Sequence, residues 1–362
     1  MSRSMKIYND HNLYILGAGF SYEANMPLMS TFITELKKAY NWYPKDSYAR
    51  DSIEAILKFR QLSTSSAYRV NLDLDNIEDL FSLAATDGYE SIKLLRTGLC
   101  ATLEYCKKTA KRPTYSVNIR DDVPYLNAKL EGLDDGMGGR KKINIDSYDY
   151  ISSVLSGIGQ QKNDQISSII SFNYDTILED SLESIGQDYT YCLKEKVRDI
   201  GKLDKTPLVK LHGSMNWLNN GKEIRIKSFD KILEDKNTPF IIPPIWTKSS
   251  SDVTNTLWGN ALELISSATR IIIIGFSLPK TDLFFRYLLA SGLQENISLQ
   301  HIYIVNPNYS EIEDDVNDLF ANNKTKELVH SIPNDTTRIF IGSKFNDLIN
   351  RPFDERIDSF TR

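Results

Sequence analysis

The sequence has few cysteines, no long hydrophobic run and no excess of basic residues. Its three cysteines, Cys100, Cys106 and Cys192, form no C-x-x-C pair, which argues against a disulfide framework or a zinc ribbon. The apolar run at 271–274 is only as long as a strand, far short of the ~18 residues of a membrane span. Residues 1–11 lack the apolar region of a signal peptide. We therefore expect a cytoplasmic protein without a metal site.

The charge of the chain argues against one further class of function. The 362 residues have a formal net charge of -5, whereas a dedicated nucleic-acid binder needs a broad basic field. The short basic run at 140–142 is typical of a solvated loop. We therefore expect no direct nucleic-acid binding and no membrane contact.

Strand and helix signals alternate along most of the chain. An apolar run at 13–16 leads into a glycine turn, and a helix is expected from about residue 30. Further strands are expected at residues 168–172, 208–211, 240–242, 270–274, 302–305 and 338–341. Helices are expected between several of them, at residues 176–184, 253–267, 283–291 and 311–321. This alternation favours an α/β fold with a doubly wound, mostly parallel, Rossmann-like sheet covered on both faces.

Residues 35–164 have a different character. They contain many helix formers and few β-branched runs, with apolar residues at helical spacing around 77–84 and 92–103 and a glycine-rich loop at 131–140. We therefore predict an inserted helical domain at 35–164. Residues 1–34 and 165–362 then form one discontinuous domain around the sheet.

The glycine turn follows the first strand. Small residues in Gly-Ala-Gly-Phe-Ser at 17–21 let the backbone approach a ligand phosphate, and a following helix start adds a favourable dipole. Tyr22 stands where the dehydrogenase fingerprint has its third glycine, so a hydride-transferring enzyme fits poorly. A tight turn without a ligand would explain the same residues.

Polar side chains follow two later strands at the point where each strand ends. Asn173 and Asp175 follow the strand at 168–172, and His212 follows the strand at 208–211. Ligands bind outside the carboxyl ends of the strands in open parallel sheets, so these groups should lie beside the glycine turn. Histidine is among the side chains that carry proton transfer, and this one is followed by Gly-Ser rather than by a core pattern.

Two further strand ends carry small or polar residues suited to phosphate and ribose. Gly275 and Ser277 follow the strand at 270–274, and Asn306 follows the strand at 302–305. Each end alone could be an ordinary turn, or a cap from Thr281 or Asp282 for the next helix. Five such ends on one sheet favour a shared ligand site.

The order of these motifs resembles the sirtuin fold: Gly-Ala-Gly-x-Ser, Asn-x-Asp, His-Gly, Gly-x-Ser and Asn. The sequences Phe-Asn-Tyr-Asp at 172–175, Leu-His-Gly-Ser at 211–214 and Gly-Phe-Ser-Leu-Pro at 275–279 resemble the bacterial branch of sirtuin-like NAD hydrolases. Many members of that branch are anti-phage defence effectors. The resemblance covers the N-terminal segment and most of the chain after residue 165, but not the helical insert.

The resemblance implies a role for each motif. Asn173, Asp175 and His212 would be the catalytic residues, with Asn173 and Asp175 at the nicotinamide end of NAD. The residues that would bind the rest of NAD are Gly17, Ala18, Gly19, Ser21, Gly275, Ser277 and Asn306. The segment 342–345 would close over the adenine.

Two departures from the family favour NAD breakdown over deacylation. Protein-deacylating sirtuins carry a four-cysteine zinc module, which three cysteines cannot supply, and Pro-Asp-Phe-Arg where this chain has Pro-Leu-Met-Ser at 27–30. Loss of nicotinamide leaves oxocarbenium-like charge on the ribose, which Asp175 could oppose. His212, as an imidazole with an ordinary pKa of about 6.5, could take a proton from water or a ribose hydroxyl near neutral pH.

Other functions stay open at this point. A zinc-independent protein deacylase would need an acyl peptide, and a non-catalytic sensor would bind NAD or ADP-ribose without cleaving it. A free NAD hydrolase would be toxic, so the resemblance implies control of activity. We expect homo-oligomerisation and a partner in trans such as a HerA-type ATPase, with the helical insert as the contact surface.

Overall fold

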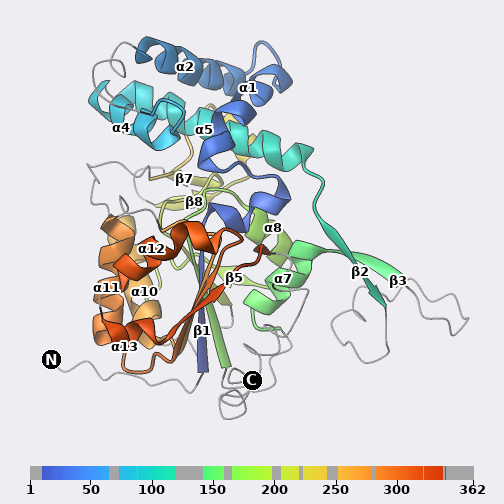
Figure 1. Ribbon diagram of the computed structural model, residues 1–362. Helices are drawn as coiled ribbons and strands as arrows, with labels where there is room; N and C mark the ends of the chain where they lie inside the picture. The colour runs from blue at the N-terminus through green and yellow to red at the C-terminus, as the bar shows by residue number, and fades with distance from the viewer. Residues whose placement is uncertain are drawn as a thin grey trace, which may run out of the picture.

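A computed structural model describes residues 10–64, 73–87, 89–118, 142–158, 165–197, 205–219, 223–242, 252–278, 283–320, 322–336 and 339. Its centre is a sheet of seven strands with helices beside it, and a second group of helices stands beyond one edge of the sheet (Figure 1). Within these ranges no helix is both long and apolar enough to cross a membrane.

Parallel pairing joins the seven strands in the order β11-β10-β9-β1-β4-β6-β5. The strands are β1 (Asp10–Leu16), β4 (Gln165–Ser171), β5 (Tyr189–Thr190), β6 (Thr206–Lys210), β9 (Arg270–Ile274), β10 (His301–Val305) and β11 (Val329–Ile332). The chain first builds the side of β4, β5 and β6, and then crosses β1 to add β9, β10 and β11. The region around β1 and β9 is therefore the switch point of the topology, where open α/β sheets bind ligands at their carboxyl edge.

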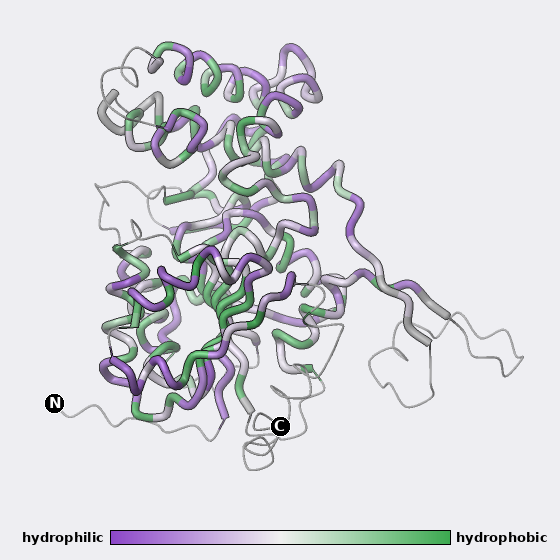
Figure 2. The backbone as a smooth tube through the Cα atoms, viewed as in Figure 1, coloured by the Kyte–Doolittle hydropathy of each residue, from purple (hydrophilic) through white to green (hydrophobic). Residues whose placement is uncertain are grey.

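Continuous apolar runs form the central strands. Every residue of β9 is buried, and so is every residue of β1 after Asp10. Strands covered on both faces need apolar residues at successive positions, because both faces of the pleat meet a helix layer. Figure 2 shows the hydrophobic colour concentrated in these strands.

Helices cover the sheet on both sides. On one side α10 (Asp252–Ser267) packs on α11 (Leu283–Glu295), and on the other α7 (Ser147–Leu155) packs on α8 (Ile177–Ser184) (Figure 1). Shorter elements complete the described fold: α9 (Phe229–Glu234), α12 (Tyr309–Leu319), α13 (Asn323–Lys326) and a hairpin of β7 (Trp217–Asn219) and β8 (Ile224–Ile226). The predicted doubly wound, Rossmann-like fold class is confirmed.

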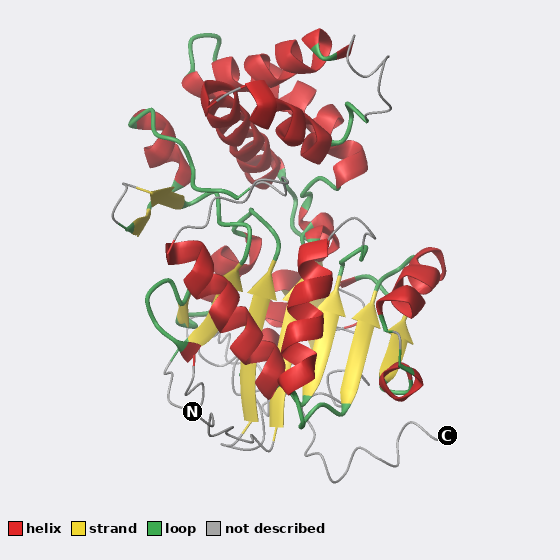
Figure 3. Ribbon diagram, turned by 90° about the vertical axis from the view of Figure 1, so that its left-hand side faces the viewer, coloured by secondary structure: helices red, strands yellow, loops and turns green. Residues whose placement is uncertain are grey.

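The segment between β1 and β4 supplies the second group of helices. These are α1 (Phe32–Trp42), α2 (Tyr48–Leu62), α4 (Ile77–Asp87) and α5 (Tyr89–Thr109). Figure 3 shows the strand arrowheads pointing towards this group, so the carboxyl edge of the sheet faces it. The same segment contains an antiparallel hairpin of β2 (Thr114–Asn118) and β3 (Lys142–Asp146), which was not predicted. The domain boundaries given above stay predictions.

Some expected elements differ from the structure or fall outside it. The strand expected at 240–242 is only an isolated bridge between Ile241 and Gly213, because the prolines at 239 and 243 lack the N–H that a ladder needs. In the strand expected at 338–341 only Ile339 is described, and it is helical. The predictions that lie outside the described residues are the loop at 131–140, the cap at 281–282 and the segment 342–345.

Two helical glycines give opposite predictions for the same substitution. A Cβ on Gly98 of α5 would lie 2.6 Å from Ile56 Cδ1 and 2.8 Å from Ser52 O, whereas a Cβ on Gly259 of α10 would meet nothing within 4 Å. We expect Gly98→Ala to lower the free energy of unfolding by about 1–3 kcal/mol through overpacking. Gly259→Ala should raise it by about 0.5–1 kcal/mol, because alanine is the better helix former. Urea denaturation measures both, and changes of the same sign would contradict the packing of α5 on α2.

Candidate active site

The glycine turn after β1 packs against the glycine turn after β9. The N–H of Gly17 donates to Ile274 O at 3.0 Å, and that of Gly19 donates to Gly275 O at 2.8 Å. A Cβ on Gly17 would lie 2.6 Å from Gly275 O, and one on Gly275, where φ is +62°, would lie 2.2 Å from Phe20 N. Contact between two turns of this chain therefore requires the glycines, and they do not by themselves indicate a bound phosphate.

Short 3₁₀ helices follow the first turn. They are η1 (Ala18–Phe20), η2 (Tyr22–Ala24) and η3 (Met29–Thr31), and α1 begins only at Phe32. The helix expected from about residue 30 is therefore present, but its start does not directly follow the glycine turn at 17–21. Ala18 is exposed, whereas Ser21 is buried. The Tyr148 hydroxyl of α7 donates to Phe20 O at 2.6 Å and fixes the turn from that side.

Ser21, Asn173 and Asp175 form one hydrogen-bonded network at the carboxyl edge. Asn173 Nδ2 donates to Gly17 O at 2.9 Å and to Ser21 Oγ at 3.3 Å. The Ser21 hydroxyl donates to Asp175 Oδ1 at 3.1 Å, and the same oxygen accepts the N–H of Ile177 at 3.0 Å. These contacts hold the Asn-x-Asp end of β4 against the glycine turn of β1, and one of them also begins α8.

Two acceptors of this network remain open. Asn173 uses only its Nδ2 and Asp175 only its Oδ1, so Asn173 Oδ1 and Asp175 Oδ2 accept no hydrogen bond within the part of the chain that the structure describes. Asn173 is 9% exposed and Asp175 is 7% exposed. Both oxygens keep some solvent exposure although their residues are largely buried, so the open pair suits a ligand that donates from hydroxyl or amide NH₂ groups.

His212 follows β6 and lies between two aromatic rings. Its ring centroid is 5.3 Å from that of Phe172, edge-on, and 5.9 Å from that of Tyr174, nearly parallel. His212 is buried. Because Phe172 and Tyr174 precede and follow Asn173, the imidazole packs on the strand end that carries the network.

The ends of β9 and β10 are joined to this region less directly. Gly275 touches the first glycine turn, as described above. Asn306 Nδ2 reaches Phe276 O at 3.5 Å, and its Oδ1 accepts the N–H of Asn308 at 2.9 Å. Ser277 is exposed, and among the described residues it forms no hydrogen bond to another candidate residue. The contacts therefore gather Gly17, Ser21, Asn173 and Asp175 most closely.

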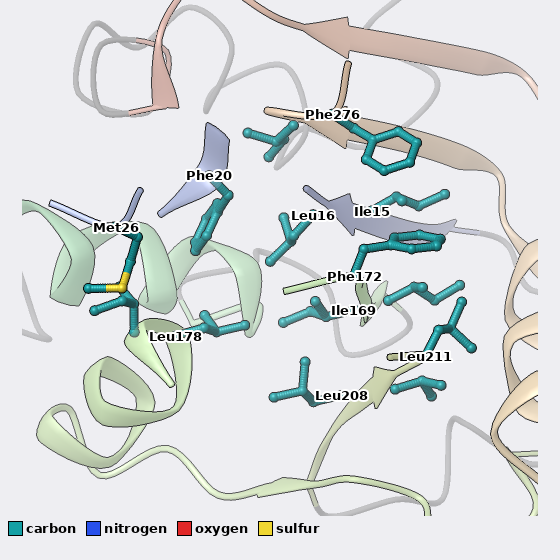
Figure 4. Close-up of a cluster of buried hydrophobic side chains, with 14 of the residues drawn as sticks. Ile15, Leu16, Phe20, Met26, Ile169, Phe172, Leu178, Leu208, Leu211 and Phe276 are labelled. Carbon is teal, nitrogen blue, oxygen red and sulfur yellow. The ribbon is translucent and has the colours of Figure 1, made fainter. Parts of the chain in front are cut away.

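An aromatic cluster borders the network and was not predicted. Phe172 and Phe276 follow β4 and β9, their ring centroids lie 5.0 Å apart, and Phe285 of α11 packs on them at 5.6 and 4.7 Å. Figure 4 shows the rings of Phe172 and Phe276 close to each other, on the same side as Ile15. Aromatic surface next to a few polar groups is typical of pockets for flat ring ligands. An aromatic residue at the ends of the two strands that flank β1 was the available signal.

A buried ion pair was also missed. Lys210 ends β6, is 1% exposed along its side chain, and places Nζ 2.7 Å from Glu179 Oε1 of α8, whose side chain is 4% exposed. The signal in the sequence is a lysine inside an apolar strand, because a buried ammonium group needs a partner of opposite charge.

The end of α5 touches both sides of the network. Lys107 Nζ donates to Thr176 Oγ1 at 2.9 Å, directly after Asp175 in the chain. Asn25 Nδ2, in the loop after the glycine turn, donates to Cys106 O at 3.4 Å. The inserted segment is therefore in direct contact with both chain segments that form the network.

The cysteines give no indication of a metal site. Burial raises the pKa of Cys106 and Cys192 to about 12 and also raises the pKa of Cys100, so the thiols are protonated at neutral pH. Across the described ranges no three or more His, Cys, Asp or Glu side chains form a metal-binding group. A metal-free site stays a prediction.

A separate cavity of about 450 Å³ lies beside the loop that follows the glycine turn. Residues of the segment 22–31 line it together with Glu35 of α1 and with Thr109 and Lys111 at the end of α5. None of the candidate site residues lines this cavity, so its volume does not bear on the network.

We expect Asp175→Asn to make the protein more stable at neutral pH. Burial raises the pKa of the Asp175 carboxyl, and this outweighs the Lys210 ammonium and the hydrogen bonds from Ile177 and Ser21, which lower it. An acid whose pKa is raised by folding destabilises the folded state once it ionises. The gain should therefore be absent in acid, where the carboxyl is protonated in the folded and unfolded chains, and should grow as pH rises through the raised pKa.

Thermal unfolding of the wild type and of Asp175→Asn between about pH 4 and pH 8 measures this difference. Asparagine keeps an Oδ1 that can accept from Ser21 and Ile177, so the network itself is preserved. A lower melting temperature for the variant than for the wild type at neutral pH would show that the surroundings stabilise the Asp175 carboxylate, contrary to the prediction.

Several solved structures are similar to this chain. One is Sir2 in complex with the inhibitor EX-527, 2'-O-acetyl-ADP-ribose and a deacetylated p53 peptide, with 12% identity, 91% of each chain covered and a TM-score of 0.38. Another is Sir2 with a p53 peptide and NAD+, with 13% identity, 91% of this chain and 90% of that chain covered and a TM-score of 0.38. A third, a Sir2 enzyme, has 13% identity, 94% and 92% coverage and a TM-score of 0.40.

One protein family matches part of the chain, whereas a search of curated proteins found no match. The matched part contains the ends of β4, β6, β9 and β10, and with them Asn173, Asp175 and His212, but not β1 and its glycine turn. Residues 167–329 match the family described as the SIR2-like domain.

Proposed function

We propose that this protein hydrolyses NAD to nicotinamide and ADP-ribose. The main support is the network at the switch point of the sheet, where the largely buried residues Asn173 and Asp175 each keep an open acceptor near His212. NAD offers matching donors in its carboxamide NH₂ group and its ribose hydroxyls. The SIR2-like match over 167–329 and the resemblance of the motifs to sirtuins support NAD as the ligand.

Each polar residue has a role in this proposal that follows from its contacts. Asp175, held through Oδ1, uses Oδ2 to accept from the carboxamide and opposes the positive charge that develops on the ribose as nicotinamide leaves. Asn173, anchored through Nδ2, uses Oδ1 to orient a ribose hydroxyl or the attacking water. His212 takes the proton from that water as its oxygen bonds to the ribose carbon.

The remaining candidate residues complete the ligand site in the proposal. Gly17, Ala18, Gly19 and Ser21 lie along the pyrophosphate and the nicotinamide ribose, while Gly275, Ser277 and Asn306 contact the phosphates and the adenosine ribose. The rings of Phe172 and Phe276 form an apolar wall that suits the nicotinamide ring and limits the entry of water. No metal takes part.

The wider role that we propose rests on the resemblance alone. The enzyme would act in the cytoplasm as an anti-phage defence effector that depletes NAD. Homo-oligomerisation and a partner in trans, such as a HerA-type ATPase, would control it. The contacts of α5 with Thr176 and Asn25 give the inserted segment a physical route to the site.

His212→Ala should lower NAD turnover by about a hundredfold to ten-thousandfold, because the variant lacks the general base. The purified protein is incubated with NAD, and nicotinamide and ADP-ribose are separated by chromatography. His301→Ala is the matched control: His301 begins β10, at the opposite end of the sheet from the network, and this variant should keep wild-type turnover.

The same assay separates the competing functions. Release of nicotinamide only after addition of an acyl-lysine peptide would favour a deacylase. Binding of NAD without release, measured by calorimetry, would favour a sensor. If the wild type neither binds nor cleaves NAD, the proposed site is wrong.

Asn173→Ala should reduce turnover and stability together. Truncation removes the hydrogen bond from Nδ2 to Gly17 O, which still accepts from Phe20 N, and so costs about 0.5–1.5 kcal/mol of unfolding free energy. Turnover should fall because the open Oδ1 acceptor is also lost. Urea denaturation and the NAD assay measure the two effects, and a folded variant with wild-type turnover would remove Asn173 from the mechanism.

A further inference from the structure

We propose that Lys210 is a positioning residue of this site: its three hydrogen bonds fix the strand end that carries Asn173 and Asp175 against the strand end that carries His212. The inference rests on the proposed function. It concerns a residue that is almost wholly buried and that acts through its neighbours rather than on the substrate.

The Lys210 ammonium joins three separate segments. It donates to the backbone O of Asp175 after β4, to Ser214 Oγ after β6 at 2.9 Å, and to Glu179 Oε1 in α8 at 2.7 Å. A lysine ammonium has three donors, so all of them are engaged. One charged group therefore spans the gap between the two strand ends and ties both to the helix behind them.

The sheet itself does not set the distance between these strand ends. The ladder between β4 and β6 closes with the pair Ser171–Lys210 and the bond from Leu211 N to Ser171 O at 3.0 Å. Asn173 and His212 both lie beyond that last bond. Met215 N and Ser214 Oγ also donate to Tyr174 O across this region, at 2.9 and 3.4 Å.

A contribution to stability alone does not explain why Lys210 and Glu179 are buried as an ion pair. Desolvation of two charges often cancels their attraction, and apolar replacements of similar volume are frequently neutral or stabilising. Here further hydrogen bonds extend from the pair, since Tyr191 donates to Glu179 Oε1 at 3.1 Å and Asn216 donates to Tyr191 at 3.0 Å. Because the Lys210 ammonium uses all three of its donors, these hydrogen bonds specify one arrangement of the segments that they join.

The charge of Lys210 has a second effect on the site. Among the groups around Asp175, it is the one that most strongly opposes the rise in pKa caused by burial. Asp180 acts in the opposite sense on the same carboxyl. The ammonium therefore favours the ionised form of Asp175 that the proposed mechanism uses.

The test is the double variant Lys210→Met/Glu179→Gln, which removes both charges and leaves neither buried alone. We expect it to fold and to show a kcat for NAD about tenfold to a hundredfold below the wild type, because reacting groups are displaced. Its Kd for ADP-ribose should change much less than kcat, since the ends of β1, β9 and β10 are untouched. The exposed pair Lys194–Glu223, whose charged atoms lie 3.0 Å apart, provides the matched control Lys194→Met/Glu223→Gln, which should behave as wild type.

A second readout does not require catalysis. The chain has four histidines, so a histidine-selective NMR spectrum contains four ring signals, and His212→Ala assigns one of them. The His212 signal feels the ring currents of Phe172 and Tyr174. In the double variant this signal should move, while those of His11, His301 and His330 should stay in place.

Lys210→Arg serves as a conservative variant if the double variant does not fold. It keeps the ion pair, but a planar guanidinium cannot donate in the three directions of an ammonium, so the same changes are expected at smaller size. Wild-type kcat in a folded variant, or four superimposed histidine signals, would overturn the positioning role. If the wild type cleaves no NAD, the proposed function fails while the histidine signals still decide the role of Lys210.

Discussion

The close approach of two backbone turns at the carboxyl edge of the sheet is the constraint on which the candidate site depends. Gly17 and Gly19 after β1 lie against Gly275 after β9, at distances that no Cβ could occupy. This contact fixes the position from which Ser21 extends, and Gly17 O in turn anchors Asn173. The glycine pattern is therefore explained by the packing of the two turns. Ligand binding would depend on the polar groups that this packing holds in place.

The sequence was informative where structure depends on local pattern. The run at 270–274 coincides with β9, because a strand buried on both faces is apolar at every position. The two-residue β5 and the edge strand β11, which mixes His330 and Ser331 with apolar residues, have no such pattern and were missed. The β2–β3 hairpin was missed because its pairing joins residues far apart in the chain, a contact that no local window contains.

The same division applies to the candidate site. Polar residues at strand ends could be predicted, because parallel strands place all their carboxyl ends at one edge of the sheet. The partner of Lys210 could not, since Glu179 lies 31 positions away and meets it only through the packing of α8 on the sheet. The sequence also could not show how the two carboxylate oxygens of Asp175 are used. Oδ1 accepts from Ser21 and Ile177 whereas Oδ2 stays open, and this depends on the geometry of three segments.

The docking of α5 has a thermodynamic consequence. Lys107 holds Thr176 and the Cys106 carbonyl holds Asn25, so the docked helix and the ordered network stabilise each other. Thermodynamic linkage makes such a coupling reciprocal. A ligand that binds and orders the network strengthens the docking of α5, and docking of α5 strengthens the binding of that ligand by the same free energy. A partner that binds the outer face of the helical group and holds α5 in place would therefore raise the affinity of the network for its ligand. The bound ligand would in turn raise the affinity of that partner.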